Sequence, residues 1–195
     1  HPQAPVPMLS LIGGKLTTCR ALGEEAAQLV MNQLGLSVAE TSRDRPVPGS
    51  RNYPLDQPGL DGALRRIEDR FGLPRAQVST VWRLLGTESE AVLTAAAGPP
   101  WDCLAGTDLP VAVVRWVIEN EWVQTLSDLV ERRLMLLYEE ALGVDCLRQL
   151  TELLVQANQL SEAGVDEELA ATTDRIRQQF GKQLVGGSAY DSNVP

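Results

Sequence analysis

Apolar side chains recur every three or four residues over most of this chain. Leu60, Leu64, Ile67 and Phe71 show this spacing first. Similar stripes follow at 78–85, 109–117, 126–137, 147–157 and 165–180. Such a stripe lies on one face of a helix, and its members are far more often core residues than cofactor contacts. The pattern therefore predicts a mainly α protein with a bundle-like packing of helices.

Capping signals divide this pattern into separate helices. Pro74 is expected to begin a helix that Gly86 ends, because proline favours the first turn and glycine the position after the last. Two further helix starts have the three-residue spacing of a capping box, Thr87 with Glu90 and Thr125 with Asp128.

The beginning of the chain has a different pattern. Residues 7–12, PMLSLI, are short and apolar enough for a buried strand, and a helix is expected from Thr17 to Leu34, ended by Gly35. A lone strand can neither pair its backbone nor cover both its faces. This strand-turn-helix unit is therefore expected to be a remnant of a larger α/β domain.

These changes of pattern predict four parts along the chain. We expect residues 1–35 to be the remnant of the larger domain and 36–60, rich in Ser, Arg, Asp, Pro and Gly, to be a linker. Residues 61–185 should form the helical domain, and 186–195 a flexible tail. Because His1 is followed by no signal-peptide pattern, this end is interpreted as a cut end.

Composition and charge exclude several functions. A net charge of −9 and a pI near 4.7 argue against a nucleic-acid partner, because that binding depends on Lys and Arg. Cys19, Cys103 and Cys146 fit neither a disulfide framework nor a metal knuckle, which favours a cytoplasmic location. His1 is the only histidine, so the chain offers no His-based metal site or catalytic base.

Acidic residues often stand in adjacent pairs, such as Glu24 with Glu25, Glu139 with Glu140, and Glu167 with Glu168. Neighbours on a helix point about 100° apart and do not form a catalytic carboxylate couple. We interpret these pairs as solvated surface.

The turn between the predicted strand and the first helix is the best candidate for a binding site. Gly13 and Gly14 allow the backbone to approach a ligand, and the helix N-terminus adds amide N–H groups and a positive dipole end. Lys15 contributes a full charge and Thr17 a hydroxyl. An anionic or electron-rich group would suit this turn, although a plain tight turn has the same sequence. The chain contains neither a GxGxxG motif nor a Walker loop. If a nucleotide binds, the main phosphate-binding residues would therefore lie outside this chain.

Two segments of the chain resemble one known family. GGKLTTCR, residues 13–20, is similar to the GGK-x-TTYR segment of FAD-dependent glycerol-3-phosphate dehydrogenases, near the end of their flavin-binding domain. Residues 110–133 resemble the helical C-terminal domain of the same family, with its pattern E-x-x-x-T-x-x-D-x-x-x-RR. The matching positions are Glu121, Thr125, Asp128, Arg132 and Arg133.

The resemblance implies that the chain is a C-terminal fragment of such an enzyme, inactive alone and without catalytic residues of its own. The family oxidises glycerol 3-phosphate to dihydroxyacetone phosphate by hydride transfer to FAD, and passes the electrons to quinone or, in related oxidases, to oxygen. The implied partners are the remainder of the flavin domain, glycerol 3-phosphate and quinone. Self-association, and peripheral attachment of the intact enzyme to the cytoplasmic membrane face, are further expectations.

The same resemblance implies roles for individual residues. Gly13, Gly14, Lys15, Leu16 and Thr17 would lie along the pyrimidine side of the flavin, and Lys15 could also face the substrate phosphate. The sequence departs from the family at Cys19, where tyrosine is usual, and at Leu134, where threonine commonly follows the arginine pair.

The acidic and basic residues of the second segment also have a structural interpretation. Asp128 and Arg132 are four residues apart on a helix and can form an ion pair. If Arg133 instead lies in the apolar stripe, its charge needs a buried partner, and Glu121 from the preceding helix is the candidate. No metal site is expected.

Two other functions remain open from the residues alone. A free-standing helical protein-interaction module without catalysis should cover residues 7–12 internally, whereas a fragment should leave them exposed, disordered or paired with another copy. A helical protein that binds a small molecule in a bundle cavity is the third hypothesis, for which no convergent polar cluster is evident in the sequence.

Overall fold

A computed structural model of the chain describes residues 7–37, 41–96, 98–140 and 142–186. The chain divides into two compact units, residues 1–47 and residues 48–195, and each is described by itself. Among the described residues no helix is both apolar enough and long enough to cross a membrane. The flexible tail predicted at 186–195 lies, apart from Gly186, outside these residues.

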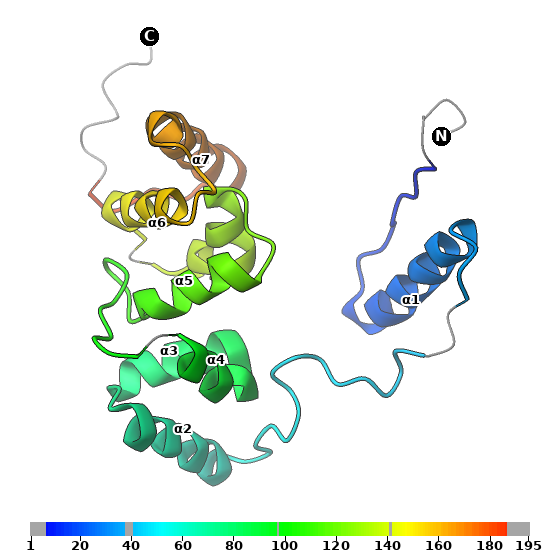
Figure 1. Ribbon diagram of the computed structural model, residues 1–195, viewed down its shortest axis with the longest axis horizontal. Helices are drawn as coiled ribbons and strands as arrows, with labels where there is room; N and C mark the ends of the chain where they lie inside the picture. Colours follow the sequence, from blue (N-terminus) through cyan, green and yellow to red (C-terminus); the bar gives the residue numbers. More distant parts are fainter. Residues whose placement is uncertain (1–6, 38–40, 97, 141, 187–195) are drawn as a thin grey trace. The chain divides into compact units, whose positions relative to one another are not determined.

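The first unit contains the helix α1, Leu16–Gln33, within one residue of its predicted ends (Figure 1). Gly35, with φ +69°, follows its C-terminus, as expected for a helix stop. The strand predicted at 7–12 is wrong, because residues 7–15 have no regular secondary structure and are exposed. The described part of this unit has no second strand to pair with the backbone of 7–12.

One polar cluster ties the segment after α1 to the helix. The Ser42 hydroxyl donates to Glu24 Oε2 at 2.8 Å, and Arg20 Nη1 donates to Glu24 Oε2 at 2.5 Å and to Ser42 Oγ at 3.0 Å. Hydrogen bonds from Ser42 and Thr41, followed by the effect of Arg20, lower the pKa of Glu24. Glu24 is therefore held by local partners, while about a third of its side chain, 33%, stays exposed to solvent.

The second unit contains the remaining helices and confirms the predicted mainly α fold. Its α-helices are α2 Gln57–Phe71, α3 Arg75–Leu85, α4 Ser89–Ala95, α5 Val111–Asn120, α6 Val144–Gln156 and α7 Val165–Phe180. Figure 1 shows α2, α3 and α4 at one end of this unit and α6 and α7 at the other, with α5 between them. A π-helix, Asp128–Arg133, and short 3-10 turns complete the described elements.

The apolar stripes of these helices form one core. Helices that are neighbours in the sequence pack against each other, α2 on α3, α4 on α5 and α6 on α7. The largest fully buried side chains come from every part of the unit and are Ile67, Val78, Leu93, Leu104, Leu109, Leu126, Leu129, Leu142, Leu147, Leu150, Leu154 and Ile176. The interpretation of the stripes as core is confirmed for the stripe residues in this list, whereas Leu93, Leu104 and Leu142 lie outside the predicted stripes.

Residues 48–56, assigned to the linker by composition, pack on α3. Gly49 and Gly86 both have positive φ, and a Cβ on Gly49 would clash with the Leu85 carbonyl. The Tyr53 hydroxyl accepts a hydrogen bond from Trp82 Nε1 at 3.0 Å, and the two rings lie 5.5 Å apart. Only glycine allows two backbones to approach this closely in this conformation. The four predicted domain boundaries stay a prediction.

The predicted capping box of Thr87 and Glu90 is wrong. Residues Gly86–Glu88 form a 3-10 turn that continues from α3, so the chain never takes the extended conformation of an N-cap there. The Thr87 N–H instead donates to the Gly49 carbonyl at 3.0 Å, and Glu90 forms an ion pair with Arg70 at 2.8 Å. The contact with residue 49 thus replaces the local cap.

Candidate functional site

The turn from Gly13 to Thr17 lies at the N-terminus of α1. Lys15 is the N-cap, no side chain accepts a hydrogen bond there, and the first turn of α1 has no acidic residue. Both the N–H and the hydroxyl of Thr18 donate to the Lys15 carbonyl at 3.1 Å. No described side chain therefore neutralises the positive end of the α1 dipole.

The surroundings of this turn are open. An added Cβ at Gly14 would meet no atom within 4 Å, whereas at Gly13 it would lie 2.9 Å from Leu22 Cδ2. Lys15, Leu16 and Thr17 are exposed, and within the described residues the Lys15 ammonium has no hydrogen-bond or ion-pair partner. Free amide N–H groups and an unpaired ammonium fit the flavin edge, which gains negative charge on reduction. Flavin binding by these residues stays a prediction.

Thr125 and Asp128 form the predicted capping box. The Asp128 N–H donates to Thr125 Oγ1 at 3.2 Å, and Asp128 Oδ2 accepts the N–H groups of Gln124 and Thr125 at 3.0 Å and the Thr125 hydroxyl at 2.9 Å. The Arg132 guanidinium binds the other carboxylate oxygen, as expected. Asp128 is only 7% exposed. Its carboxylate is therefore bound by neighbouring groups of the protein and is not accessible to a ligand.

The predicted pair of Arg133 with Glu121 is also present. Arg133 Nη1 lies 3.4 Å from Glu121 Oε2, and Arg133 Nη2 donates to the Trp122 carbonyl at 3.3 Å. About a third of each charged side chain is exposed, 34% for Arg133 and 32% for Glu121. The pair is therefore partly solvated, and its expected contribution to stability is smaller than that of a fully buried pair.

Two contacts to α7 that are not evident from the sequence hold the π-helix. Glu131 accepts two hydrogen bonds from Arg175, at 2.5 and 2.9 Å, and these bonds lower the pKa of Glu131. Glu168 accepts the Leu126 N–H at 2.8 Å. Glu168, interpreted as solvated surface, is partly exposed and also holds this backbone N–H. No sequence signal points to either contact, because the partners are more than 40 residues apart.

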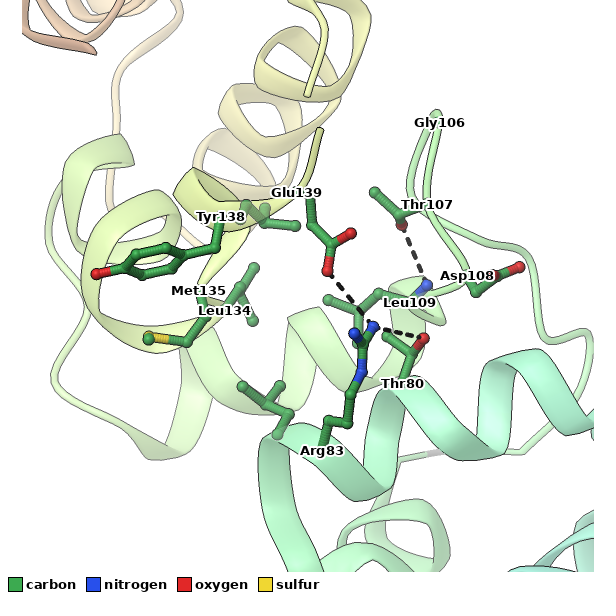
Figure 2. A pocket seen from close by; sticks show the side chains of 12 residues that line it. Thr80, Arg83, Gly106, Thr107, Asp108, Leu109, Leu134, Met135, Tyr138 and Glu139 are labelled. Carbon is green, nitrogen blue, oxygen red and sulfur yellow. Dashed lines mark hydrogen bonds and ion pairs between the residues drawn. The ribbon is translucent and has the colours of Figure 1, made fainter. Parts of the chain in front are cut away.

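The second unit also contains a pocket of 620 Å³. Figure 2 shows it between the end of α3, the loop before α5 and the segment after the π-helix. Its lining residues are Thr80, Arg83, Leu84, Gly106, Thr107, Asp108, Leu109, Leu134, Met135, Leu136, Tyr138 and Glu139. Arg83 and Glu139 face each other across it, with Nη2 3.4 Å from Oε1. Sequence reasoning missed this site and assigned Glu139 to solvated surface.

The cysteines and carboxylates form no metal site in the part of the chain that the structure describes. Burial raises the pKa of Cys146 to about 12. Burial, followed by the charge of Asp108, also raises the pKa of Cys103. Both groups are therefore neutral thiols at physiological pH and poor metal ligands or nucleophiles.

Residues 40–165 match the family model described as the C-terminal domain of alpha-glycerophosphate oxidase. The chain is 31% identical over 134 residues to a glycerol-3-phosphate dehydrogenase of Synechocystis sp., covering 65% of this chain and 23% of that protein. It is 29% identical over 131 residues to a D-erythritol 1-phosphate dehydrogenase of Brucella abortus, covering 65% and 25%. It is 31% identical over 96 residues to an anaerobic glycerol-3-phosphate dehydrogenase subunit A1 of Haloferax volcanii, covering 49% and 15%.

The chain thus spans a quarter or less of the length of these relatives. No solved structure matches it significantly. The turn at 13–17 lies outside the family match, which includes the capping box at Thr125 and the arginine pair that follows it. Because the match covers well over half of the residues, the chain belongs to the family of the C-terminal domain of alpha-glycerophosphate oxidase.

Proposed function

We propose that this chain is the C-terminal portion of an FAD-dependent dehydrogenase of sugar-alcohol phosphates, with glycerol 3-phosphate as the first candidate substrate. The family match over residues 40–165 carries this proposal. The names of the relatives support it, because two are glycerol-3-phosphate dehydrogenases and the third acts on erythritol 1-phosphate. The reaction is oxidation of the alcohol to the ketone, with the electrons passed to quinone.

Bound FAD would supply the hydride acceptor. Within this chain, the N-terminus of α1 and the Lys15 ammonium would hold the negative charge that collects at one edge of the reduced ring. Gly14 would let that edge approach the backbone, because an added Cβ there would point into open space. Leu16 and Ile12, both about nine-tenths exposed, would cover apolar surface beside it.

The exposed apolar surface of the first unit supports the proposal that a further domain packs against it. No residue of α1 is buried. The large apolar side chains exposed in this unit are Met8, Leu9, Leu11, Ile12, Leu16, Leu29, Val30, Leu34, Leu36 and Val47. The remainder of the flavin domain would cover this surface. A free-standing interaction module is disfavoured, because it would cover residues 7–12 itself.

The second unit would serve as a packing and assembly domain. Asp128, Glu131 and Glu121 are all engaged with neighbouring groups of the fold. This supports a structural role for Arg132, which pairs with Asp128, and for Arg133, which pairs with Glu121, whereas Glu131 pairs with Arg175 of α7. We assign no catalytic residue to this unit.

The test compares the 195-residue chain with the longer polypeptide that the proposal requires, in which the remainder of the flavin domain precedes these residues. The longer polypeptide is expected to purify yellow with bound flavin and to oxidise glycerol 3-phosphate with a quinone analogue as acceptor, whereas the 195-residue chain should be colourless and inactive. Erythritol 1-phosphate and oxygen form the alternative substrate and acceptor arms. A longer polypeptide without flavin, or a yellow 195-residue chain, would contradict the proposal.

The role of Lys15 has its own test in the longer polypeptide. Lys15→Met should lower the flavin reduction potential by about 30 mV, equivalent to a tenfold change for a two-electron couple, because the reduced flavin loses a nearby positive charge. Lys182→Met, at the other lysine of this chain, is the matched control and should leave the potential unchanged. An unchanged potential in Lys15→Met would exclude Lys15 from the flavin edge.

A further inference from the structure

The walls of the pocket in the second unit are held in place by hydrogen bonds. Thr107 donates its hydroxyl to the Leu104 carbonyl at 2.9 Å and accepts the Leu109 N–H at 3.1 Å. The Glu139 N–H donates to the Leu136 carbonyl at 3.0 Å, and Lys182 Nζ donates to the Glu139 carbonyl at 2.7 Å. The loop and the opposite segment are thus preorganised without any ligand.

The floor of the pocket is apolar. Leu109, Leu134 and Leu136 are buried, with 2%, 6% and 2% of their surface exposed. Met135, in the left-handed conformation at φ +55°, stands at the rim beside Tyr138, and both are exposed. Six of the twelve lining residues are polar or charged and the others are apolar or glycine, so the pocket offers both kinds of contact to a small molecule.

Unlike the hydrogen-bonded walls of the pocket, the Arg83 side chain is held only by weak contacts. Its side chain is 68% exposed, and its contacts are long, 3.4 Å to Glu139 Oε1 and 3.5 Å to Thr80 Oγ1. No other hydrogen bond of its guanidinium is recorded among the described residues. A guanidinium has five N–H donors in a fixed fork that fits carboxylates and phosphates. Most of the donor capacity of Arg83 is therefore available to an incoming oxyanion.

The charged side chains that line the pocket are one cation, Arg83, and two carboxylates, Asp108 and Glu139. Figure 2 shows the Arg83 guanidinium directed towards Glu139 and the Asp108 carboxylate directed away from Arg83. Lys182 adds a second cation at the backbone of Glu139. Glu139 is thus the carboxylate that competes for Arg83, and at 3.4 Å it does so weakly.

We propose that this pocket binds a small amphipathic oxyanion, a phosphate monoester or a carboxylate. Its anionic group binds the Arg83 guanidinium in place of the Glu139 carboxylate. Its carbon chain lies on the floor formed by Leu109, Leu134 and Leu136. The site consists only of residues of the second unit and its test needs no flavin, so it stands or fails independently of the proposed function.

The test uses the 195-residue chain and ligands that share one carbon chain but differ in the head group. Hexyl phosphate and hexanoate should bind at millimolar concentration by calorimetry, whereas hexanol and hexylamine should not. Inorganic phosphate should bind more weakly than hexyl phosphate, because it leaves the apolar floor uncovered. The ratio of the hexyl phosphate and hexanoate affinities identifies the preferred head group.

Two substitutions with opposite expected signs locate the site. Arg83→Gln should weaken hexyl phosphate binding about tenfold, because it removes the charged donor. Glu139→Gln should tighten it severalfold, because it removes both the competitor and the repulsion. Arg65→Gln, at an exposed arginine of α2 outside the pocket, should change nothing. The melting temperature of each variant confirms that it is folded.

Several outcomes would overturn this inference. Binding of hexylamine in preference to the anions, with the two substitution effects reversed, would make the pocket a cation site. An equal loss in Arg83→Gln and Arg65→Gln would mean that the anions respond only to total charge. Absence of binding by both anions at concentrations well above millimolar would also reject the site.

Discussion

The helices α1 and α6 have similar apolar content but very different burial. α6, Val144–Gln156, buries Cys146, Leu147, Leu150, Thr151, Leu153 and Leu154. α1, Leu16–Gln33, is longer and buries none of its residues. An isolated helix of this length is marginal in water, and most helical stability in proteins comes from tertiary packing. The contrast indicates that the second unit supplies its own core, whereas the first unit needs a partner.

The sharpest test of this contrast removes one leucine from each helix. Leu150→Ala in α6 should lower the free energy of unfolding by about 3 kcal/mol, because Leu150 is fully buried and its loss leaves a cavity. Leu29→Ala in α1 should not change the unfolding of the second unit, since Leu29 is 47% exposed. Urea denaturation of the 195-residue chain measures both. Equal effects would mean that α1 shares the core.

Two glycines with positive φ, one in each unit, allow a second comparison of the same kind. Gly49→Ala should cost about 2 to 3 kcal/mol, because it adds backbone strain and a clash with the Leu85 carbonyl. Gly35→Ala has comparable strain but open space around it, and should leave the melting of the second unit unchanged. Thermal melts of both variants distinguish the two cases. A neutral Gly49→Ala would show that residues 48–56 do not dock on α3.

The buried carboxylate of Asp128 should contribute somewhat less. Asp128→Ala is expected to cost about 2 kcal/mol, because it removes the cap and leaves the N–H groups of Gln124 and Thr125 without acceptors. Glu121→Ala should cost less than 1 kcal/mol, since its pair with Arg133 is partly solvated. Chemical denaturation gives both values, and a reversed order would contradict the assigned geometry.

The smallest expected effect depends on pH. Because Arg175 lowers the pKa of Glu131 in the folded state, the pair stabilises above the unfolded-state pKa of glutamate. That stability is lost as the pH falls through the lower folded-state pKa. Glu131→Gln should therefore reduce the melting temperature at neutral pH and converge with the unmodified chain in acid. Glu24→Gln, in the first unit, should leave this transition unchanged at every pH.

Local signals predicted much of the helical framework. The proline and glycine at the ends of α3, the box at Thr125 and the stop at Gly35 were correct because each depends on backbone groups a few residues away. The pair of Asp128 with Arg132 was predictable for the same reason. The expected strand at 7–12 failed because strand pairing needs a second segment, and composition cannot supply one.

Local capping and periodicity patterns could not predict contacts between segments that are distant in the sequence. Thr87 and Glu90 have the correct spacing for a cap, yet Gly49 and Arg70 bind them instead. The Glu131–Arg175 pair and the pocket at Arg83 join segments dozens of residues apart. Nothing in the local pattern distinguishes Arg83 from the other exposed arginines of the chain.

Periodicity and caps by themselves determined the ends of α1 and α3 and the capping box at Thr125, because those depend on groups within one or two turns. The resemblance of two short segments indicated the family. Only the tertiary structure decided which charged side chains are bound by other groups of the protein and which can bind a ligand. Asp128, Glu131 and Glu139 are all carboxylates, and they differ in the neighbours that the fold brings to them. The tertiary structure also showed that no apolar residue of α1 is buried within the described part of its own unit.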